Sequence, residues 1–597
     1  MSNLRKLKDP LYGYVYYSAF EEKIIEHPLV LRLHHIRQNG AAFLTYPSMR
    51  VHRFEHSLGA MHVAGLLYKS AIEFSEAGPV DSCLADLINA IDGNSVSQIL
   101  TDILKASHGK GLGFLTEDRF YTYNCLNEIE NHKIFARLLV FQSLRIAALV
   151  HDIGHPPFSH TFESALKQVR RTEYSNHETV GLELLNCIIE DVFQDTDGHW
   201  YFFAKAVLKL VSAIIDKANP SHWRVSALNE IVSGDVDADR LDYVRRDTLS
   251  SGSSTNAYDL GRLVDAVRFK CNQETNGKSL QLVMTADALS TIEAFFNVRF
   301  HLYRWMLWHH NVVRHNLAII LVIKILANLS AQADGEIKRT ATEIMAIALD
   351  VGRRREYWYF TDFYLLDKLA LCMRLLDSAT IPAGANGDQL RLLRRYLRTF
   401  LYREKHHLRP LWKRPDDYVR FGEHVTGQVA PAEGARDFNK LLRDAYRRFA
   451  ESAARVSGID AANAALLAQF MNENVEYLSG AFCDEMETYI SNDLVADKVK
   501  VRAYYLAKFK PCPTGLVLHN RDGDWTQGYD IGVLSPSISA LNQAWEGLPH
   551  LWLFVEKLPE AGISLPIEGD PQCPALYGPI GKSMAKYLRP GGGAAMP

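Results

Sequence analysis

The sequence predicts a mainly α-helical protein with a little β-structure, on three observations. Apolar residues recur at spacings of three and four from Ile24 to Ile36, and Gly40 closes this segment. A second apolar run covers about 135–153 and is stopped by the Pro156-Pro157 pair. Hydrophobic residues make up 47% of the 597 residues and charged residues 23%, which provides a core and excludes a disordered or collagen-like chain.

The remaining elements follow from the same patterns, in chain order. Helical periodicity predicts further helices over 177–192, 201–216, 237–249 and 286–330. A β-hairpin is predicted near 264–285, where VDAVRFK and SLQLVMT flank the turn-rich NQETNGK. Residues 320–500 are again predicted to be helical. After Lys510 the composition becomes rich in Pro and Gly and indicates a short α+β or irregular module with a flexible tail.

Charge and cysteine usage narrow the class of protein. The net charge of −3 provides no global positive field to recruit nucleic acid. The eight cysteines are scattered without a CxxC pair and predict reduced thiols, neither a zinc ribbon nor a disulfide framework. The N-terminal segment has no apolar signal region, and the most apolar stretch, 317–323, is interrupted by Lys324. These features predict a cytoplasmic protein without membrane contact.

Histidine and aspartate concentrate in four short segments: HRFEH (52–56), HDIGHPPFSH (151–160), NHE (176–178) and DVDADRLDY (235–243). His151 and Asp152 end an apolar helix, where a buried carboxylate needs a partner. Imidazole nitrogen and carboxylate oxygen suit Mg²⁺ or a transition metal better than they suit a thiolate-type zinc site. An arginine or a helix N-terminus would explain one such pair, but four clusters together favour a metal.

Two further sets of residues have four-residue spacing and would each share one helix face: Asp239, Tyr243 and Asp247, and Arg299, Tyr303 and Leu307. Taken alone, the first set is compatible with a solvated acidic face and the second with ordinary amphipathic packing.

The ordered motifs HRFEHSLG, HDIGHPPFSH, NHE and DVDADRLDYVRRD resemble those of the HD-domain deoxynucleoside triphosphate triphosphohydrolases. The likeness begins at Asp9 and runs to about His315. It implies an HD-domain helical bundle that hydrolyses a dNTP to a deoxynucleoside and triphosphate by attack at the α-phosphorus. It also implies one divalent metal (Mn, Fe, Zn or Mg), Mg²⁺ on the substrate phosphates, and a homo-oligomer built from dimers, as a tetramer or hexamer.

The resemblance assigns roles residue by residue. The family's metal ligands fall on His56, His151, Asp152 and Asp239, with Asp235 and Asp237 as alternatives to the last. Its catalytic histidines fall on His155 and His177, with Glu163 orienting His155. The positions of the substrate site are Arg53, His160, Arg240 and Arg299 for the phosphates, and Gln38, Tyr243, Asp247 and Tyr303 for the sugar and its surroundings.

The chemistry of these residues is consistent with the implied reaction. A metal held by two histidines and two aspartates polarises a phosphoryl oxygen and lowers the pKa of a bound water. Arginines clamp a polyphosphate through charge-assisted, often bidentate bonds. The chain has no P-loop motif, so cleavage at the γ-phosphate is not expected.

The sequence departs from the family at three places. Residues 72–134 look like an insertion in the phosphohydrolase core, which we place at 1–320, before a helical C-terminal lobe (321–510) and the small module (511–597). The family reads an activating guanine nucleotide with Asp, Gln and Arg, where this chain has Glu26, Leu31 and His34. Activation by GTP is therefore not expected, although another nucleotide effector stays open. A tyrosine that packs on the sugar in the family aligns with Leu307, which predicts weaker rejection of ribonucleotides.

Two alternative functions remain open at this point. One is an HD phosphohydrolase or phosphodiesterase that acts on another nucleotide or on single-stranded nucleic acid. The other is an inactive, nucleotide-sensing HD scaffold, for which the basic run 391–414 with its interleaved aromatic residues is the best support. A solvated helix whose arginine stems cover apolar surface explains that run more simply, so nucleic acid is not favoured. Every predicted metal and catalytic position carries a competent residue, which argues against an inactive scaffold.

Overall fold

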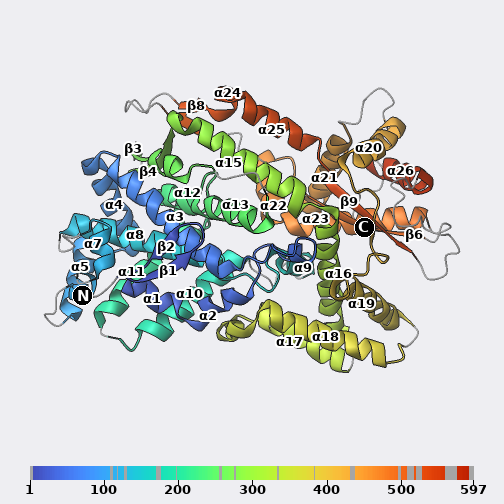
Figure 1. Cartoon of the computed structure of the whole chain (residues 1–597), viewed down its shortest axis with the longest axis horizontal. Coiled ribbons are helices and arrows are strands. Elements are labelled where there is room, and N and C mark those ends of the chain that lie inside the picture. The colour runs from blue at the N-terminus through green and yellow to red at the C-terminus, as the bar shows by residue number, and fades with distance from the viewer. Residues whose placement is uncertain are drawn as a thin grey trace.

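The computed structural model confirms a mainly α-helical protein (Figure 1). It describes residues 4–589 except for 108–111, 117, 127–130, 170–175, 197, 254–257, 275–276, 333–334, 382–383, 430–436, 495–498, 507–515, 520–527 and 558–573. One continuous cluster of buried apolar side chains runs from Val15 to Leu588. The division into three parts stays a prediction, and 590–597, the predicted flexible tail, lie outside the described residues.

The first quarter of the chain opens with an antiparallel hairpin that the sequence patterns did not indicate, β1 (Lys6–Asp9) and β2 (Gly13–Tyr16). The helices that follow are α1 (Ala19–Ile25), α2 (Pro28–Leu31), η1 (Arg32–His35), η2 (Ala42–Leu44), α3 (Arg53–Glu73), α4 (Ala77–Asp92), α5 (Val96–Ala106), α6 (Gly113–Thr116), α7 (Arg119–Tyr123) and α8 (His132–Val150). Helix α8 is almost entirely buried from Phe135 to Val150, which explains its uniformly apolar sequence, and it packs against α3.

The middle of the chain carries most of the predicted site. Its elements are α9 (His160–Val169), α10 (His177–Phe193), α11 (Gly198–Ile215), η3 (His222–Arg224), α12 (Ser226–Ser233), α13 (Ala238–Ser251), α14 (Leu260–Asp265), β3 (Val267–Glu274), β4 (Gly277–Thr285), η4 (Ala286–Ala288), α15 (Leu289–Leu302), η5 (Tyr303–Leu307) and α16 (His310–Gln332). The predicted hairpin is confirmed, because β3 pairs antiparallel with β4 from Val267 opposite Met284 to Glu274 opposite Gly277. Part of its predicted turn, 275–276, lies outside the described residues.

The C-terminal part is again helical and returns to the N-terminal part. Its elements are α17 (Glu336–Leu349), η6 (Val351–Tyr359), α18 (Asp362–Ser378), α19 (Ala385–Leu401), β5 (Arg409–Pro410), α20 (Pro415–Val429), α21 (Asp437–Val456), α22 (Ala464–Glu473), α23 (Val475–Asp493), β6 (Val499–Tyr505), β7 (Val517–His519), β8 (Gly528–Asp530), α24 (Ile531–Leu534), α25 (Pro536–Glu546), β9 (Leu551–Lys557) and α26 (Pro574–Leu588). Strand β7 pairs in parallel with β4, and β5, β9 and β6 form a separate sheet. Helices α16 and α23 both pack on α9. The chain after residue 310 therefore contacts the element that carries part of the predicted site.

A disulfide between Cys83 of α4 and Cys271 of β3 corrects the expectation that all cysteines are reduced. The two residues are 188 positions apart, so no local spacing marks them, but the packing of α4 on β3 and β4 brings their Cα atoms to 6.6 Å. Cys125, Cys187, Cys372 and Cys483 are free. Cys512 and Cys573 lie outside the described residues.

Among the described residues, two helices are long and apolar enough, by length and composition alone, to cross a membrane: Gly198–Ile215 and His310–Ala331. Within these segments, 56% and 83% of the residues are buried inside the protein, as in the core helices of globular proteins. Lys324, in the middle of the second helix, forms an ion pair with Asp484 of α23 at 2.7 Å.

Candidate active site

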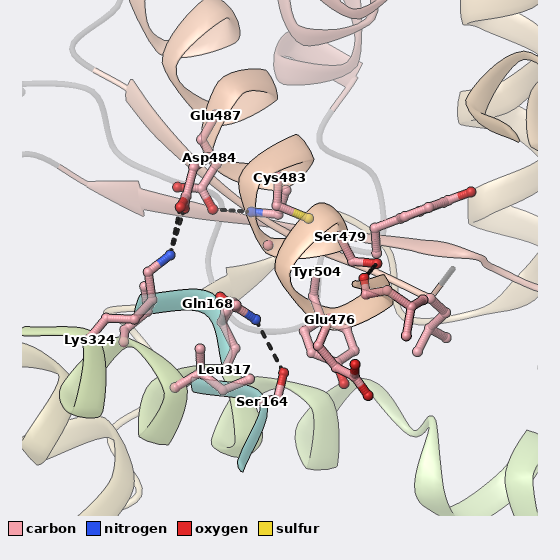
Figure 2. Close-up of a pocket in the computed structure, with 17 residues that line it drawn as sticks. Ser164, Gln168, Leu317, Lys324, Glu476, Ser479, Cys483, Asp484, Glu487 and Tyr504 are labelled. Atoms are coloured by element: carbon pink, nitrogen blue, oxygen red, sulfur yellow. Dashed lines mark hydrogen bonds and ion pairs between the residues drawn. The ribbon is translucent and has the colours of Figure 1, made fainter. Parts of the chain in front are cut away.

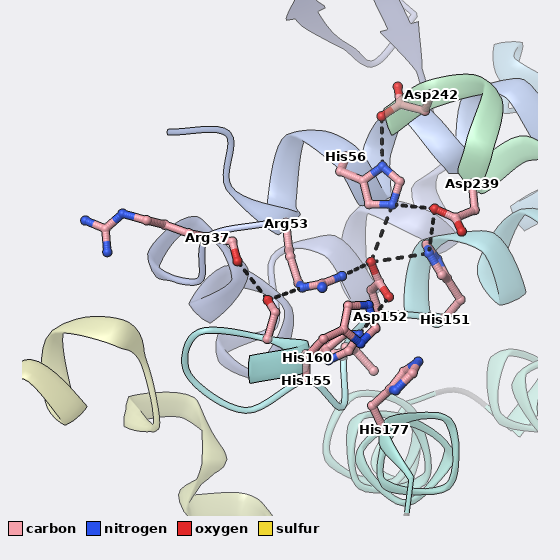
Figure 3. A network of polar contacts seen from close by, with 12 residues as sticks. Arg37, Arg53, His56, His151, Asp152, His155, His160, His177, Asp239 and Asp242 are labelled. Atoms are coloured by element: carbon pink, nitrogen blue, oxygen red, sulfur yellow. Dashed lines mark hydrogen bonds and ion pairs between the residues drawn. The ribbon is translucent and has the colours of Figure 1, made fainter. Parts of the chain in front are cut away.

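The four predicted metal ligands converge, although they come from three separate elements (Figure 3). His56 lies on α3, His151 and Asp152 directly follow α8, and Asp239 lies in the first turn of α13. The Nε2 atom of His56 is 3.4 Å from Asp152 Oδ2 and 3.1 Å from Asp239 Oδ1. The Nε2 atom of His151 is 3.3 Å and 3.8 Å from the same two oxygens. Two ring nitrogens and two carboxylate oxygens therefore face a common point.

The hydrogen bonds of the two histidines fit a metal at that point. His56 Nδ1 is 2.9 Å from Asp242 Oδ2, and His151 Nδ1 donates to the carbonyl oxygen of Ala148 at 2.7 Å. Both Nε2 atoms are buried and lack a hydrogen-bond partner among the described residues. With Nδ1 carrying the proton, each Nε2 presents its lone pair, so the donor set is two imidazoles and two carboxylates. This set suits Mn²⁺, Fe²⁺ or Zn²⁺. Asp237, the alternative to Asp239, instead caps α13 and pairs with Arg240.

The two carboxylates are held in the ionised form that a cation requires. Burial by itself would raise the pKa of each carboxyl group. The charge of Arg53, together with the neighbouring ring of His151, outweighs burial and holds the pKa of Asp152 well below its usual range. The close approach of the His151 and His56 rings outweighs burial in the same way and lowers the pKa of Asp239.

Asp242, which the sequence analysis did not assign, supports the predicted metal ligand His56 from behind. Arg246 donates to both of its oxygens, at 2.9 and 2.8 Å, and the hydroxyl of Tyr12 donates to Asp242 Oδ1 at 2.9 Å. A Cβ atom at Gly59 would lie 1.8 Å from Asp242 Oδ1, so only glycine leaves room for this carboxylate. Through Tyr12, which lies between β1 and β2, the N-terminal hairpin is thereby connected to the candidate metal site.

We predict that Asp242→Asn weakens metal binding. The amide is a poorer acceptor than the carboxylate for the Nδ1 proton of His56, and loss of such an outer partner costs about 10–100-fold in metal affinity. The dissociation constant for Mn²⁺ or Zn²⁺, measured by competition with a chromophoric chelator, tests this, and circular dichroism reports whether the fold survives. An unchanged affinity in a folded variant would show that α3 alone orients His56.

Three histidines surround Glu163 beside the metal ligands. Glu163 lies 3.0 Å from His177 Nδ1, 3.3 Å from His160 Nδ1 and 3.7 Å from His155 Nδ1. Its hydrogen bonds therefore go to His177 and His160 rather than to His155, the residue that it was expected to orient. His155 is fully buried, stacks on the ring of His177 at 3.9 Å, and has its Nε2 3.3 Å from Asp152 Oδ1.

We predict that Glu163→Gln lowers the pKa of His177. Burial alone lowers this pKa, but the ion pair with Glu163 outweighs burial and raises it above the ordinary histidine value. Because the folded-state pKa is raised, the pair stabilises the fold fully below the ordinary value, and this contribution is lost as pH rises through the raised one. NMR titration of the His177 ring should show the decrease, and the variant should lose more thermal stability at pH 6 than at pH 9. An unchanged titration would mean that Glu163 does not set the charge of His177.

All eight predicted substrate-binding residues line one cavity of about 380 Å³, which Asp152 and Asp239 also line. The members of this set are Gln38, Arg53, His160, Arg240, Tyr243, Asp247, Arg299 and Tyr303. Of the three histidines around Glu163, His160 is thus the one that lines this cavity. Its side chain is 70% exposed. His177 lines a different cavity of about 820 Å³ together with Lys167, so the structure does not bring it to the same space.

The cavity contains both cationic side chains and buried oxygen acceptors. Arg299 Nε donates to the hydroxyl of Tyr243 at 3.1 Å, and Arg240 pairs with Asp237 at 3.0 Å. The carboxyl oxygens of Asp247 and the amide oxygen of Gln38 are buried without a hydrogen-bond partner among the described residues. Burial raises the pKa of Asp247 to about 7. Such buried acceptors are suited to the hydroxyl groups of a ligand, because an unpaired buried polar atom is costly.

Further residues of the cavity wall escaped the sequence analysis, among them Tyr504 and Trp308. Tyr504 comes from β6 and also lines an adjoining cavity of about 310 Å³, where α9 and α16 face α23 (Figure 2). No local motif marks Tyr504, since the pairing of β6 with β9 and the packing of α23 on β6 decide its position.

Comparison with known proteins finds similarity over the part of the chain that carries much of the candidate site. The HD domain family matches residues 134–247. The chain is 26% identical over 262 residues to the deoxynucleoside triphosphate triphosphohydrolase SAMHD1 homolog of Dictyostelium discoideum, covering 43% of this chain and 38% of that protein. It is 23% identical over 382 residues to SAMHD1 of Danio rerio, covering 60% and 50%. An uncharacterized protein of Methanocaldococcus jannaschii is 26% identical over 309 residues, covering 52% and 47%.

The matched region thus spans about half the length of these curated relatives, or less. The crystal structure of a phosphohydrolase from Bacteroides thetaiotaomicron superposes with a TM-score of 0.50 at 16% identity, over 93% of this chain and 100% of that one, and so shares its fold. The chain therefore contains an HD domain over residues 134–247, is similar to these relatives over about half of its length, and shares the fold of the Bacteroides thetaiotaomicron phosphohydrolase.

Proposed function

We propose that the protein hydrolyses deoxynucleoside triphosphates to a deoxynucleoside and triphosphate. The observation that carries this proposal is a single cavity in which Asp152 and Asp239 lie with three arginines and with the buried acceptors Gln38 and Asp247. Cationic groups suit a polyphosphate, and buried acceptors suit the hydroxyl of a sugar. The relatives named as deoxynucleoside triphosphate triphosphohydrolases support the same substrate.

In the proposed reaction the oxygen of water forms a bond to the α-phosphorus, the bond from phosphorus to O5′ breaks, and O5′ takes up a proton. A divalent metal held by the four ligands would supply Lewis-acid polarisation of the phosphoryl group and activation of water. Arg240 and Arg299 neutralise the triphosphate as it leaves. His160 lines the cavity and is held by Glu163, so we assign it as the proton donor to O5′. The rings of His155 and His177 contact that of His160, and we assign to these two histidines the positioning of Asp152 and Glu163.

The test is to incubate the protein with each dNTP and Mn²⁺ or Mg²⁺ in ¹⁸O-labelled water and to identify both products. Deoxynucleoside together with triphosphate that carries the ¹⁸O is the expected result, since attack at phosphorus places the label there. A deoxynucleoside monophosphate with pyrophosphate, or orthophosphate alone, would contradict the proposal and favour another phosphoester reaction. Asp152→Ala protein, prepared in parallel, controls for contaminating phosphatases.

We predict that GTP alone does not activate the enzyme. Leu31 offers no hydrogen bond to a base edge, and His34 lacks the forked donor of arginine and stacks on Phe54 at a ring distance of 3.7 Å. Initial rates with a saturating dNTP, with and without GTP, should agree. Light scattering in the same samples reports whether a dNTP drives assembly of a homo-oligomer. A steep rise in rate with GTP would contradict this prediction.

A further inference from the structure

A π-helical turn lies between α15 and α16, on the wall of the cavity. Residues Tyr303–Leu307 form this turn, η5, and the N–H of Trp308 donates to the carbonyl oxygen of Tyr303 at 3.0 Å. This is a bond between residues five apart, whereas an α-helix joins residues four apart. The π-turn therefore contains one extra residue. Single π-turns inside helices occur frequently at functional sites.

The extra residue changes which side chain follows Tyr303 along the cavity wall. In a regular α-helix, Leu307 would follow Tyr303 on the same face, as the four-residue spacing predicts. With the π-turn, Trp308 takes the next position along the wall. Tyr303, Leu307 and Trp308 all line the cavity, and the ring of Trp308 lies 5.1 Å from that of Tyr303. The wall therefore contains a large aromatic surface that the sequence register did not predict.

The C-terminal part of the chain supports Trp308 from behind. Its ring lies 4.3 Å from that of Trp545 on α25, and Trp545 is 4% exposed. Trp545 in turn stacks on His550 at 5.1 Å and packs with Phe300 of α15. Figure 1 shows α25, in red, beside α15, in green. A side chain held in this way loses little conformational freedom on binding a ligand.

We propose that Trp308, placed by the π-turn and supported by Trp545, is the aromatic surface on which the nucleoside of the substrate stacks, and that Trp308 rather than Leu307 sets the selectivity for the nucleoside. This inference rests on the proposed function, because it assumes a nucleotide in the cavity. An indole ring provides a broad polarisable face for a base or a sugar, whereas the branched side chain of Leu307 provides none. The acceptors Gln38 and Asp247 lie in the same cavity and are available to the sugar hydroxyl.

The test compares Trp308→Ala, Trp308→Phe and Leu307→Ala in the full-length protein. Calorimetric titration with a dNTP analogue in which a methylene group replaces O5′, so that the bond broken in the proposed reaction is absent, measures binding without turnover. Loss of base stacking corresponds to about tenfold or more in affinity. We expect that loss in Trp308→Ala, only a small loss in Trp308→Phe, and a change within about twofold in Leu307→Ala. Trp545→Ala should reproduce part of the loss. The kcat/KM ratio of a dNTP to its matched NTP should fall in Trp308→Ala and stay unchanged in Leu307→Ala.

Several outcomes would overturn the inference. One is equal losses in Trp308→Ala and Leu307→Ala; another is unchanged binding in Trp308→Ala. If Trp308→Ala does not fold, a loss in Leu307→Ala larger than that in Trp308→Phe overturns it equally. Binding of the analogue without hydrolysis of any dNTP would contradict the proposed reaction alone. Failure of the wild-type protein to bind any nucleotide would overturn both.

Discussion

Asp152→Ala is expected to abolish turnover and to strip the protein of its metal. Asp152 provides one of four donors, and its Oδ2 lies within 3.4 Å of the Nε2 atoms of both His56 and His151. The substitution also leaves Arg53 without the carboxylate that it contacts in a fully buried position. The buried guanidinium of Arg53, left without its carboxylate, would repel a cation at the site. The affinity for the metal should therefore fall further than the loss of one ligand alone would explain. His151→Ala should have the same consequence through the loss of a ring nitrogen.

The measurement is metal content by plasma mass spectrometry together with the rate of dNTP hydrolysis. Asp444→Ala, on an exposed position of α21, is the matched control and should keep full metal and full activity. EDTA should stop the wild-type reaction, and added Mn²⁺ should restore it. Where Asp152→Ala is too unstable to purify, Asp152→Asn retains the shape of the side chain and removes the charge. Full activity with full metal occupancy in Asp152→Ala or His151→Ala would show that the metal ligands lie elsewhere.

His160→Ala is expected to lower kcat by about 10²–10⁴-fold, the usual contribution of a general acid, while metal content stays unchanged. Among the three histidines around Glu163, His160 lines the cavity of the predicted substrate residues, and its Nδ1 is 3.3 Å from the carboxylate. His177→Ala should lower turnover less, because His177 lines the neighbouring cavity and acts through Glu163 and His155. Both variants should retain the metal, because neither residue is one of the four ligands.

Steady-state kinetics of the two variants, with metal analysis, separates these roles. Because the side chain of His160 is 70% exposed, added imidazole should occupy the vacated space and restore part of the activity of His160→Ala but not that of His177→Ala. If His160→Ala keeps its kcat within about threefold while His155→Ala loses activity with metal retained, the buried histidine is the proton donor and our assignment is wrong.

The sequence by itself determined the features that rest on local spacing. The apolar run of α8 and the paired segments of the β3–β4 hairpin were predictable because burial and strand pairing repeat along neighbouring residues. Asp239, Tyr243 and Asp247 line one cavity because their four-residue spacing places them on one face of α13. The ordered histidine and aspartate motifs predicted which side chains would come together at the candidate metal site.

Only the tertiary structure decided the features that depend on distant contacts or on a change of helical register. Asp242 contacts His56, 186 positions away in the sequence, because α3 packs on α13. Cys83 forms a disulfide with Cys271, 188 positions away, because α4 packs on β3. Tyr504 reaches the cavity through strand pairing near the end of the chain. The π-turn replaces a four-residue step by a five-residue one, so Trp308 enters the wall beside Leu307. Periodicity describes the average helix, whereas this change of register accompanies a contact with a distant part of the chain, that of Trp308 with Trp545.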